Sequence, residues 1–83
     1  MNDKNTTVYY SDYCSHCKKL KKWLTKQNIL FKELDVNDPE VSKELDERGV
    51  KGIPYTVIEY IDTHKTQEII GFNKEKFEII FLP

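Results

Sequence analysis

The two cysteines of this 83-residue chain stand three positions apart, in the order Cys14-Ser15-His16-Cys17. They follow a β-branched and aromatic run at residues 7–10 and open a segment with strong helical periodicity. Two sulfurs at this spacing can form a reversible disulfide at the start of a helix, where unpaired backbone N–H groups and the helix dipole stabilise a thiolate. In a chain expected to be intracellular, this pattern favours a redox site over a structural metal site.

The composition is that of a globular chain forming one small domain, predicted to span residues 1–83. Its formal net charge of −1 gives no reason to expect nucleic acid or a membrane as a partner, and we expect a monomer. The segment from Met1 to Thr6 lacks the apolar core of a signal peptide, so the expected location is the cytoplasm. In that compartment a cysteine pair is typically transient and catalytic.

The periodicity of the remaining sequence predicts the element order β-α-β-α-β-β-α. Strands are expected at residues 7–10, 29–36, 55–61 and 67–70, and helices at 15–27, 38–49 and 73–81. Asp38 before Pro39 is typical of a helix start, as is Asn73, whereas Gly49 is typical of a helix end. A strand–helix–strand unit followed by a hairpin predicts a four-stranded mixed sheet with helices on both faces, which is the α/β thioredoxin fold.

Cys14 is the predicted nucleophile of the pair. It precedes the first helical turn and should be the more exposed sulfur, whereas Cys17 shares the inward face of the helix with Leu20 and Leu24. Cys14 would therefore attack a substrate disulfide, and Cys17 would release the reduced substrate by attacking Cys14. The helix N-terminus, the neighbouring lysines and His16 are candidates for lowering the pKa of Cys14, and the sequence does not rank them.

Other interpretations of the cysteine pair stay open. One alternative is two unrelated buried thiols. Another is a redox-inert interaction module on the same fold. A zinc site needs four ligands, and with only the two cysteines, His16 and His64 as soft ligands, a site within one chain is disfavoured. The alternative function from a different class is a metal- or iron–sulfur-cluster-binding carrier that dimerises through Cys14.

The residues around the pair suggest further roles. A basic run follows the cysteines and comprises Lys18, Lys19, Lys21 and Lys22. A solvated helix face is its favoured interpretation, and the alternative is attraction of an anionic thiol such as glutathione or of an acidic partner surface. Tyr13, directly before Cys14, is expected to line the rim of the site.

Several residues have a structural explanation from their type alone. The apolar side chains expected to pack in the core are Trp23, Phe31, Leu34 and Val36. Pro54 begins the third strand, and the base rate for X–Pro bonds predicts a trans peptide there. Gly71 and Phe72 are compatible with a plain strand-to-helix turn that contributes one aromatic side chain to the core.

Four segments also form a familiar combination. They are Val8-Tyr9-Tyr10-Ser11, Cys14-x-x-Cys17, Gly52-Ile53-Pro54 and Gly71-Phe72-Asn73-Lys74-Glu75-Lys76. Together they resemble the glutaredoxin family, and especially its small bacterial glutaredoxin-like branch, which includes the NrdH-type redoxins. The resemblance runs from about residue 7 to residue 81 and so covers nearly the whole chain.

The resemblance implies roles that the residue patterns do not. Pro54 matches the family's cis-proline beside the cysteines, and the backbone of Ile53 would pair with the substrate segment that carries the reacting cysteine. Gly71 and Phe72 match the loop that borders the substrate groove. The resemblance also implies that dithiol exchange needs no tightly bound cofactor, with glutathione as a candidate co-substrate.

The chain departs from the family's glutathione-using members. Ser15-His16 stands where those proteins usually have Pro-Tyr, and Ser11 stands where they often have Lys or Arg. Phe72 and Asn73-Lys74 replace their second glycine and the following aspartate. These departures weaken the case for tight glutathione recognition, and Gly71-Phe72 is more like the redoxins that thioredoxin reductase reduces. The electron donor is therefore either glutathione or thioredoxin reductase.

The sequence thus predicts a cytoplasmic, glutaredoxin-like thiol–disulfide oxidoreductase that reduces protein or small-molecule disulfides. Its predicted site comprises the catalytic pair Cys14 and Cys17, the pKa-tuning candidate His16, and the substrate-binding residues Tyr13, Ile53, Pro54, Gly71 and Phe72. No bound metal is expected.

Overall fold

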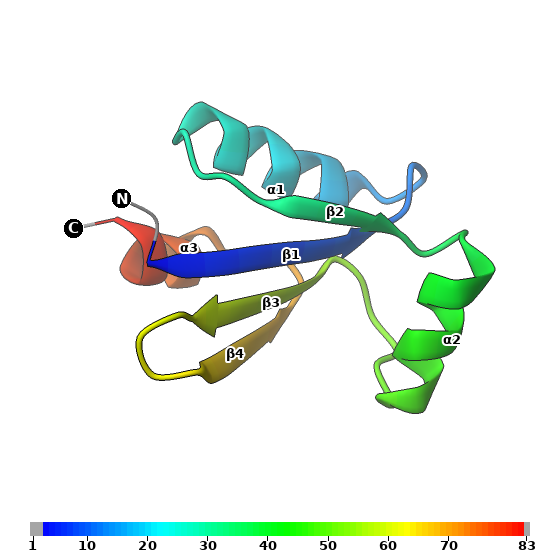
Figure 1. The fold of residues 1–83 in the computed structure, drawn as a ribbon. Helices are drawn as coiled ribbons and strands as arrows, with labels where there is room; N and C mark the ends of the chain where they lie inside the picture. The colour runs from blue at the N-terminus through cyan, green and yellow to red at the C-terminus, as the bar shows by residue number, and fades with distance from the viewer. Residues whose placement is uncertain (1–2, 83) are drawn as a thin grey trace.

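The computed structural model describes residues 3–82, so Met1, Asn2 and Pro83 of the predicted domain lie outside the described residues. Its elements follow the predicted order (Figure 1). They are β1 (Lys4–Tyr10), α1 (Ser15–Lys26), β2 (Lys32–Asp35), α2 (Pro39–Glu47), β3 (Tyr55–Tyr60), β4 (Lys65–Ile70) and α3 (Lys74–Phe81).

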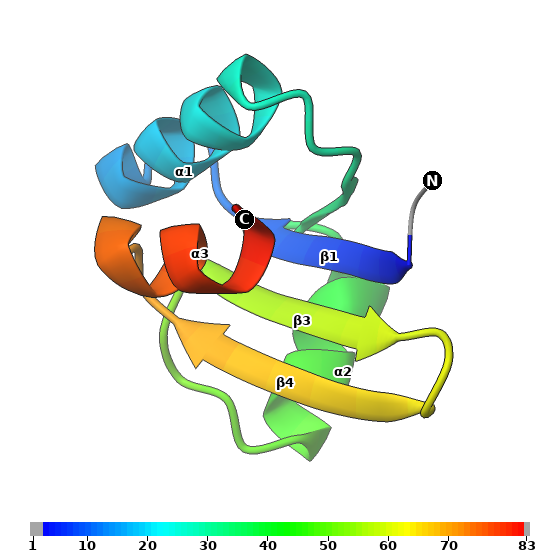
Figure 2. The ribbon, with the colours of Figure 1, turned by 90° about the vertical axis from the view of Figure 1, so that its left-hand side faces the viewer.

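The four strands form one mixed sheet in the order β2-β1-β3-β4. β1 runs parallel to β2 and antiparallel to β3, and β4 runs antiparallel to β3. Tyr9 near the end of β1 pairs with Tyr55 at the start of β3. This register brings the loop after β1, which carries the cysteines, beside the segment that leads into β3. The predicted mixed sheet with helices on both faces is confirmed, with α1 and α3 on one face and α2 on the other (Figure 2).

Two strands are longer than predicted and two are shorter, β3 only by its last residue, Ile61. β1 begins at Lys4 rather than at residue 7 because its polar first half pairs with β3, as in the pairing of Lys4 with Tyr60. β4 begins at Lys65 because it pairs along the whole of β3. β2 covers only Lys32–Asp35, since the segment before it is a turn in which the N–H of Ile29 donates to the carbonyl of Leu24 at 2.9 Å.

The larger core lies between the sheet and the α1–α3 layer. Its buried side chains are Val8, Leu20, Trp23, Leu24, Ile58, Ile69 and Phe77. Trp23 packs in this core as predicted, and its ring centroid lies 6.1 Å from that of Phe77 and 6.2 Å from that of Phe72. This aromatic cluster fastens α1 to α3, so it fixes the position of the helix that begins at the cysteines.

The smaller core lies beneath α2 and contains the buried residues Tyr9, Leu45 and Tyr55. Leu34 and Val36, which were expected to be buried, are only half-buried at its margin, and Phe31 is half-buried at the margin of the larger core. The reason is that β2 is an edge strand with a single neighbour, so its side chains are covered from one side only.

Two tyrosine hydroxyls add polar contacts to the smaller core. The hydroxyl of Tyr9 donates to Oε1 of Glu44 on α2 at 2.6 Å, and the hydroxyl of Tyr55 donates to Glu68 on β4. Burial, together with the hydrogen bond to Glu44 and its negative charge, raises the pKa of Tyr9 to about 12. Burial and the bond to Glu68 also raise the pKa of Tyr55. Both phenols are therefore held in the neutral form in the folded chain.

The raised pKa of Tyr9 predicts a loss of stability in alkali. An unfolded tyrosine ionises near pH 10, whereas folded Tyr9 keeps its proton up to about pH 12, so the folded state binds more protons in this window. The free energy of unfolding should therefore be fully retained below pH 10 and should fall between pH 10 and about 12. Urea unfolding across this range should show a shallower fall for Tyr9→Phe. The fall in the free energy of unfolding should also be shallower for Glu44→Gln, because glutamine keeps a hydrogen-bond acceptor but removes the negative charge beside Tyr9. An unchanged slope in Tyr9→Phe would contradict the assignment.

Candidate active site

Cys14 is the N-cap residue of α1. Its backbone is extended, with φ −99° and ψ 110°, and its Sγ accepts a hydrogen bond from the backbone N–H of Cys17 at 3.1 Å. The turn before it is held by Ser11, whose carbonyl accepts from the N–H of Cys14 at 3.1 Å and whose Oγ accepts from the N–H of Tyr13 at 3.3 Å. Ser11 is a site residue that the sequence did not predict, although a serine at this offset is typical of such turns.

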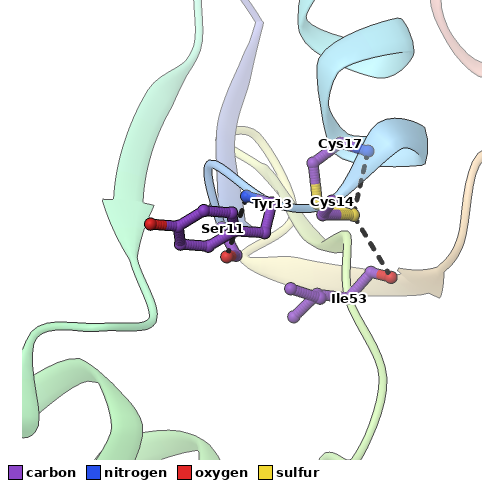
Figure 3. Close-up of a disulfide and its surroundings, with 5 residues drawn as sticks. All are labelled: Ser11, Tyr13, Cys14, Cys17 and Ile53. Atoms are coloured by element: carbon purple, nitrogen blue, oxygen red, sulfur yellow. Dashed lines mark hydrogen bonds between the residues drawn. A yellow bond between two sulfur atoms is a disulfide. The ribbon is translucent and has the colours of Figure 1, made fainter.

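The two cysteines form a disulfide, with their Cα atoms 5.2 Å apart (Figure 3). Cys17 is fully buried on the inward face of α1, whereas Cys14 is half-buried. This is the asymmetry predicted from the helix pattern. A reagent that approaches from solvent therefore meets the sulfur of Cys14 first.

Ile53 approaches the disulfide from the segment before β3, and Pro54 follows it in the chain. The carbonyl oxygen of Ile53 is 4.0 Å from Sγ of Cys14 (Figure 3). The Ile53–Pro54 peptide bond is cis, so the trans bond expected from base rates is wrong and the geometry implied by the family resemblance is correct. Base rates fail at this position because they average over all prolines, whereas this one lies buried beside a functional pair.

Gly71 is hydrogen-bonded to the Ile53–Pro54 segment. Its N–H donates to the carbonyl of Pro54 at 2.8 Å, and its φ of +91° lies in the region that favours glycine. Gly52 lies so close to Ile70 on β4 that a Cβ at position 52 would be 2.9 Å from the Ile70 Cγ2. The β4–α3 turn and the loop before β3 therefore form one packed unit beside the cysteines.

The remaining predicted site residues are Phe72, Tyr13 and His16. Phe72 is half-buried, and its ring packs into the aromatic cluster with Phe77 at a centroid distance of 5.5 Å. Tyr13 is 93% exposed, and its ring extends away from the two sulfurs (Figure 3). His16 is exposed on the first turn of α1. The structure thus brings Ile53, Pro54 and Gly71 together around the pair, and leaves Tyr13 and His16 in solvent.

A shallow hollow of about 400 Å³ adjoins Ile53 on the side of α2. Its lining combines apolar side chains from α2 and the flanking loops with a few polar groups, and includes Val36, Ser42, Leu45, Asp46, Val50 and Ile53. The surface next to Ile53 on this side is therefore concave and mixed in character, and it is too shallow to enclose a large ligand.

This arrangement suits thiol–disulfide exchange. One sulfur is accessible and receives a backbone N–H bond, and a second sulfur is buried within bonding reach. An N–H donor at a helix N-terminus favours a thiolate over a thiol. Within residues 3–82, no three His, Cys, Asp or Glu side chains gather as a metal ion would require. None of the helices in that range is long and apolar enough to cross a membrane.

Comparison with known proteins gives consistent matches. The family model for glutaredoxin matches residues 6–69. The glutaredoxin-like protein NrdH from two strains of Lactococcus lactis is 37% identical over 49 residues, which cover 58% of this chain and 68% of the relative.

Solved structures share the fold. The glutaredoxin-like NrdH-redoxin from Escherichia coli superposes with a TM-score of 0.76 at 18% identity, covering 95% of this chain and 97% of that one. Oxidised mitochondrial thioredoxin 3 from Saccharomyces cerevisiae superposes with a TM-score of 0.70 at 27% identity, covering 95% and 76%.

Gly71 and Gly49 offer a matched pair of substitutions. Both have positive φ, at +91° and +71°, and a Cβ at either position meets no atom within 4 Å. Alanine at either site should therefore cost about 1 kcal/mol of stability through the backbone alone, measured by urea unfolding. Only Gly71→Ala should also slow disulfide exchange, because a shift of the backbone away from its positive φ would displace the N–H that holds the carbonyl of Pro54. Equal exchange rates in the two variants would contradict this role for Gly71.

Proposed function

Because this chain belongs to the glutaredoxin family of thiol–disulfide oxidoreductases, we propose that it reduces disulfides by a dithiol cycle in which Cys14 attacks and Cys17 resolves. The observation that carries the role assignment is the difference in burial between the two sulfurs. Cys17 is fully buried on the inward face of α1, whereas Cys14 caps the helix and is half-buried. A buried thiol reacts readily only with the sulfur already beside it, which suits a resolving role.

The cycle balances in two exchanges. The thiolate of Cys14 bonds to one sulfur of the substrate disulfide, and the other substrate sulfur leaves as a thiolate that takes a proton from solvent. Cys17 then loses its proton, bonds to Sγ of Cys14 and releases the first substrate sulfur as a second thiol. The substrate has gained two electrons and two protons, and the pair has become a disulfide. No tightly bound cofactor is needed for either step.

The substrate segment would lie against the corner formed by Ile53, Pro54 and Gly71. The carbonyl of Ile53 faces the sulfur of Cys14, so an extended substrate backbone placed there would bring its own cysteine to the nucleophile. The bond from Gly71 to Pro54 supports this corner from behind. Tyr13 and Phe72 would contribute at its margins, and His16 would act on the thiolate only through its charge. The proposed setting is one domain working in the cytoplasm as a monomer.

The two cysteines should respond differently to substitution. Cys14→Ser should abolish turnover of a protein disulfide, because it removes the attacking sulfur. Cys17→Ser should stop after the first exchange and accumulate a mixed disulfide, detectable by intact mass spectrometry and released by dithiothreitol. Ser15→Ala, in the same helical turn, should retain turnover and serves as the control. Turnover by Cys14→Ser, or alkylation of Cys17 before Cys14 in the reduced protein, would contradict the assignment.

Return to the dithiol form requires a reductant that supplies two electrons, and two classes are proposed. Either two glutathione molecules or the dithiol of thioredoxin reductase can reduce the Cys14–Cys17 disulfide. The chain differs from glutathione-using glutaredoxins at Ser11, Phe72 and Asn73. These differences favour thioredoxin reductase as the electron donor.

The donor is tested by giving the oxidised protein two reducing systems in parallel, glutathione with its reductase and NADPH with thioredoxin reductase. NADPH oxidation should be faster with thioredoxin reductase. A faster rate with glutathione would assign the chain to the glutathione-dependent members instead.

A further inference from the structure

Charge is unevenly distributed between the two helices that flank the site. α1 contains five lysines and no acidic residue, namely Lys18, Lys19, Lys21, Lys22 and Lys26. α2, on the opposite face of the sheet, contains four acidic residues and one lysine, namely Glu40, Lys43, Glu44, Asp46 and Glu47. The near-zero net charge of the chain therefore conceals a basic helix and an acidic one.

One of the five lysines, Lys21, makes contacts with other residues of the fold. Lys21 pairs with Oε1 of Glu33 at 2.9 Å, and its ammonium lies 3.8 Å from the centre of the Tyr10 ring. The other four are exposed, and within residues 3–82 none has an acidic partner within 4 Å. At roughly 100° per residue they fall within one arc of about 100° on the outer side of α1. We call these four residues, Lys18, Lys19, Lys22 and Lys26, the α1 basic face.

The stability of α1 does not explain this face. Lys18 and Lys22 are four residues apart, as are Lys22 and Lys26, and like charges at this spacing destabilise a helix. Lys18 and Lys19 also lie near the N-terminal end, where the helix dipole disfavours positive charge. If the face contacted only solvent, alternating lysine and glutamate would stabilise the helix more.

The face starts one turn beyond Cys14 and continues away from it. At 1.5 Å per residue, Lys26 lies about 18 Å from Cys14 along the helix axis. A tripeptide such as glutathione spans at most about 10 Å when fully extended, so it could reach the first-turn lysines but not Lys26. Only a longer ligand anchored at Cys14 could contact the whole face.

We propose that the α1 basic face docks an acidic segment of the protein whose disulfide Cys14 attacks. This inference rests on the proposed function and names the class of substrate that the site prefers. Opposite charge along α1 would steer the segment to the nucleophile and raise the rate of encounter, an effect that salt screens. A protein partner is favoured over nucleic acid, because the chemistry at Cys14 requires a disulfide.

The test uses two synthetic peptides that each contain one intramolecular disulfide. One carries four glutamates on one side of the disulfide, within a segment long enough to span about 18 Å, and the other carries glutamines in their place. Stopped-flow mixing with the reduced protein gives the second-order rate constant for each peptide. At low ionic strength the glutamate peptide should react about tenfold faster. At about 1 M salt, where the Debye length is near 3 Å, the two rates should converge.

Charge-neutralised variants locate the effect. In Lys22→Gln/Lys26→Gln the ratio of the two rate constants should fall towards one. Lys43→Gln/Lys65→Gln removes two exposed lysines away from α1 and should keep the tenfold ratio. At physiological salt, where the Debye length is about 8 Å, the rate with oxidised glutathione should be the same in both double variants, because neither tripeptide half, joined to Cys14 through its sulfur, reaches the distal lysines.

Three outcomes would overturn the inference. Equal rates for the two peptides in the native protein would remove the preference for acidic substrates while leaving disulfide reduction intact. Dependence of the glutathione reaction on Lys22 and Lys26 would assign the face to small anionic thiols. Self-association at low salt that is abolished in Lys22→Gln/Lys26→Gln would assign it to the acidic α2 of a second copy. Failure to reduce either peptide would instead refute the proposed function.

Discussion

The placement of Cys14 at the cap of α1 is the constraint on which the rest of the site depends. A cap residue needs extended backbone and a side-chain acceptor, and the sulfur of Cys14 fills that role by accepting the N–H of Cys17. Sulfur is a weak acceptor, so the cap alone is a poor anchor. The turn at Ser11 and the inward packing of Cys17 supply the remaining support. The residue that starts the helix is thereby also the residue best placed to react.

Ile53, Pro54 and Gly71 come close to Cys14 only because the strands of the sheet are paired in this register. The pairing of Tyr9 with Tyr55 sets the start of β3 beside the end of β1, and Ile53 and Pro54 occupy the two positions just before that start. The hydrogen bond from the N–H of Gly71 to the carbonyl of Pro54 then holds the β4–α3 turn beside this segment. Three loops that are distant in sequence meet because the strands between them are held in register, and α1 is fixed against them by the aromatic contacts with α3.

These relations explain which features could be predicted from the sequence. The helix starts at Asp38 and Asn73 follow from local capping rules, and both side chains accept backbone N–H bonds at their caps. The burial of Cys17 follows from helical periodicity. The cis bond at Pro54 depends on partners far along the chain, whereas the core position of Phe72 is already one interpretation of its sequence context. Local propensity carries no information about those partners, and for Pro54 only the family resemblance supplied it.

The basic residues of α1 act over two different ranges. Lys18 and Lys19 lie within about a turn of Cys14, so their charge acts on the thiolate as well as on any partner. Lys22 and Lys26 lie about 12 and 18 Å from Cys14 along the axis, beyond the Debye length of about 8 Å at physiological salt. Their charge is therefore largely screened from the reacting sulfur and can act only on what lies above the helix. The chemistry of exchange is thus set at the first turn of α1, whereas the choice of partner is open to the residues further along it.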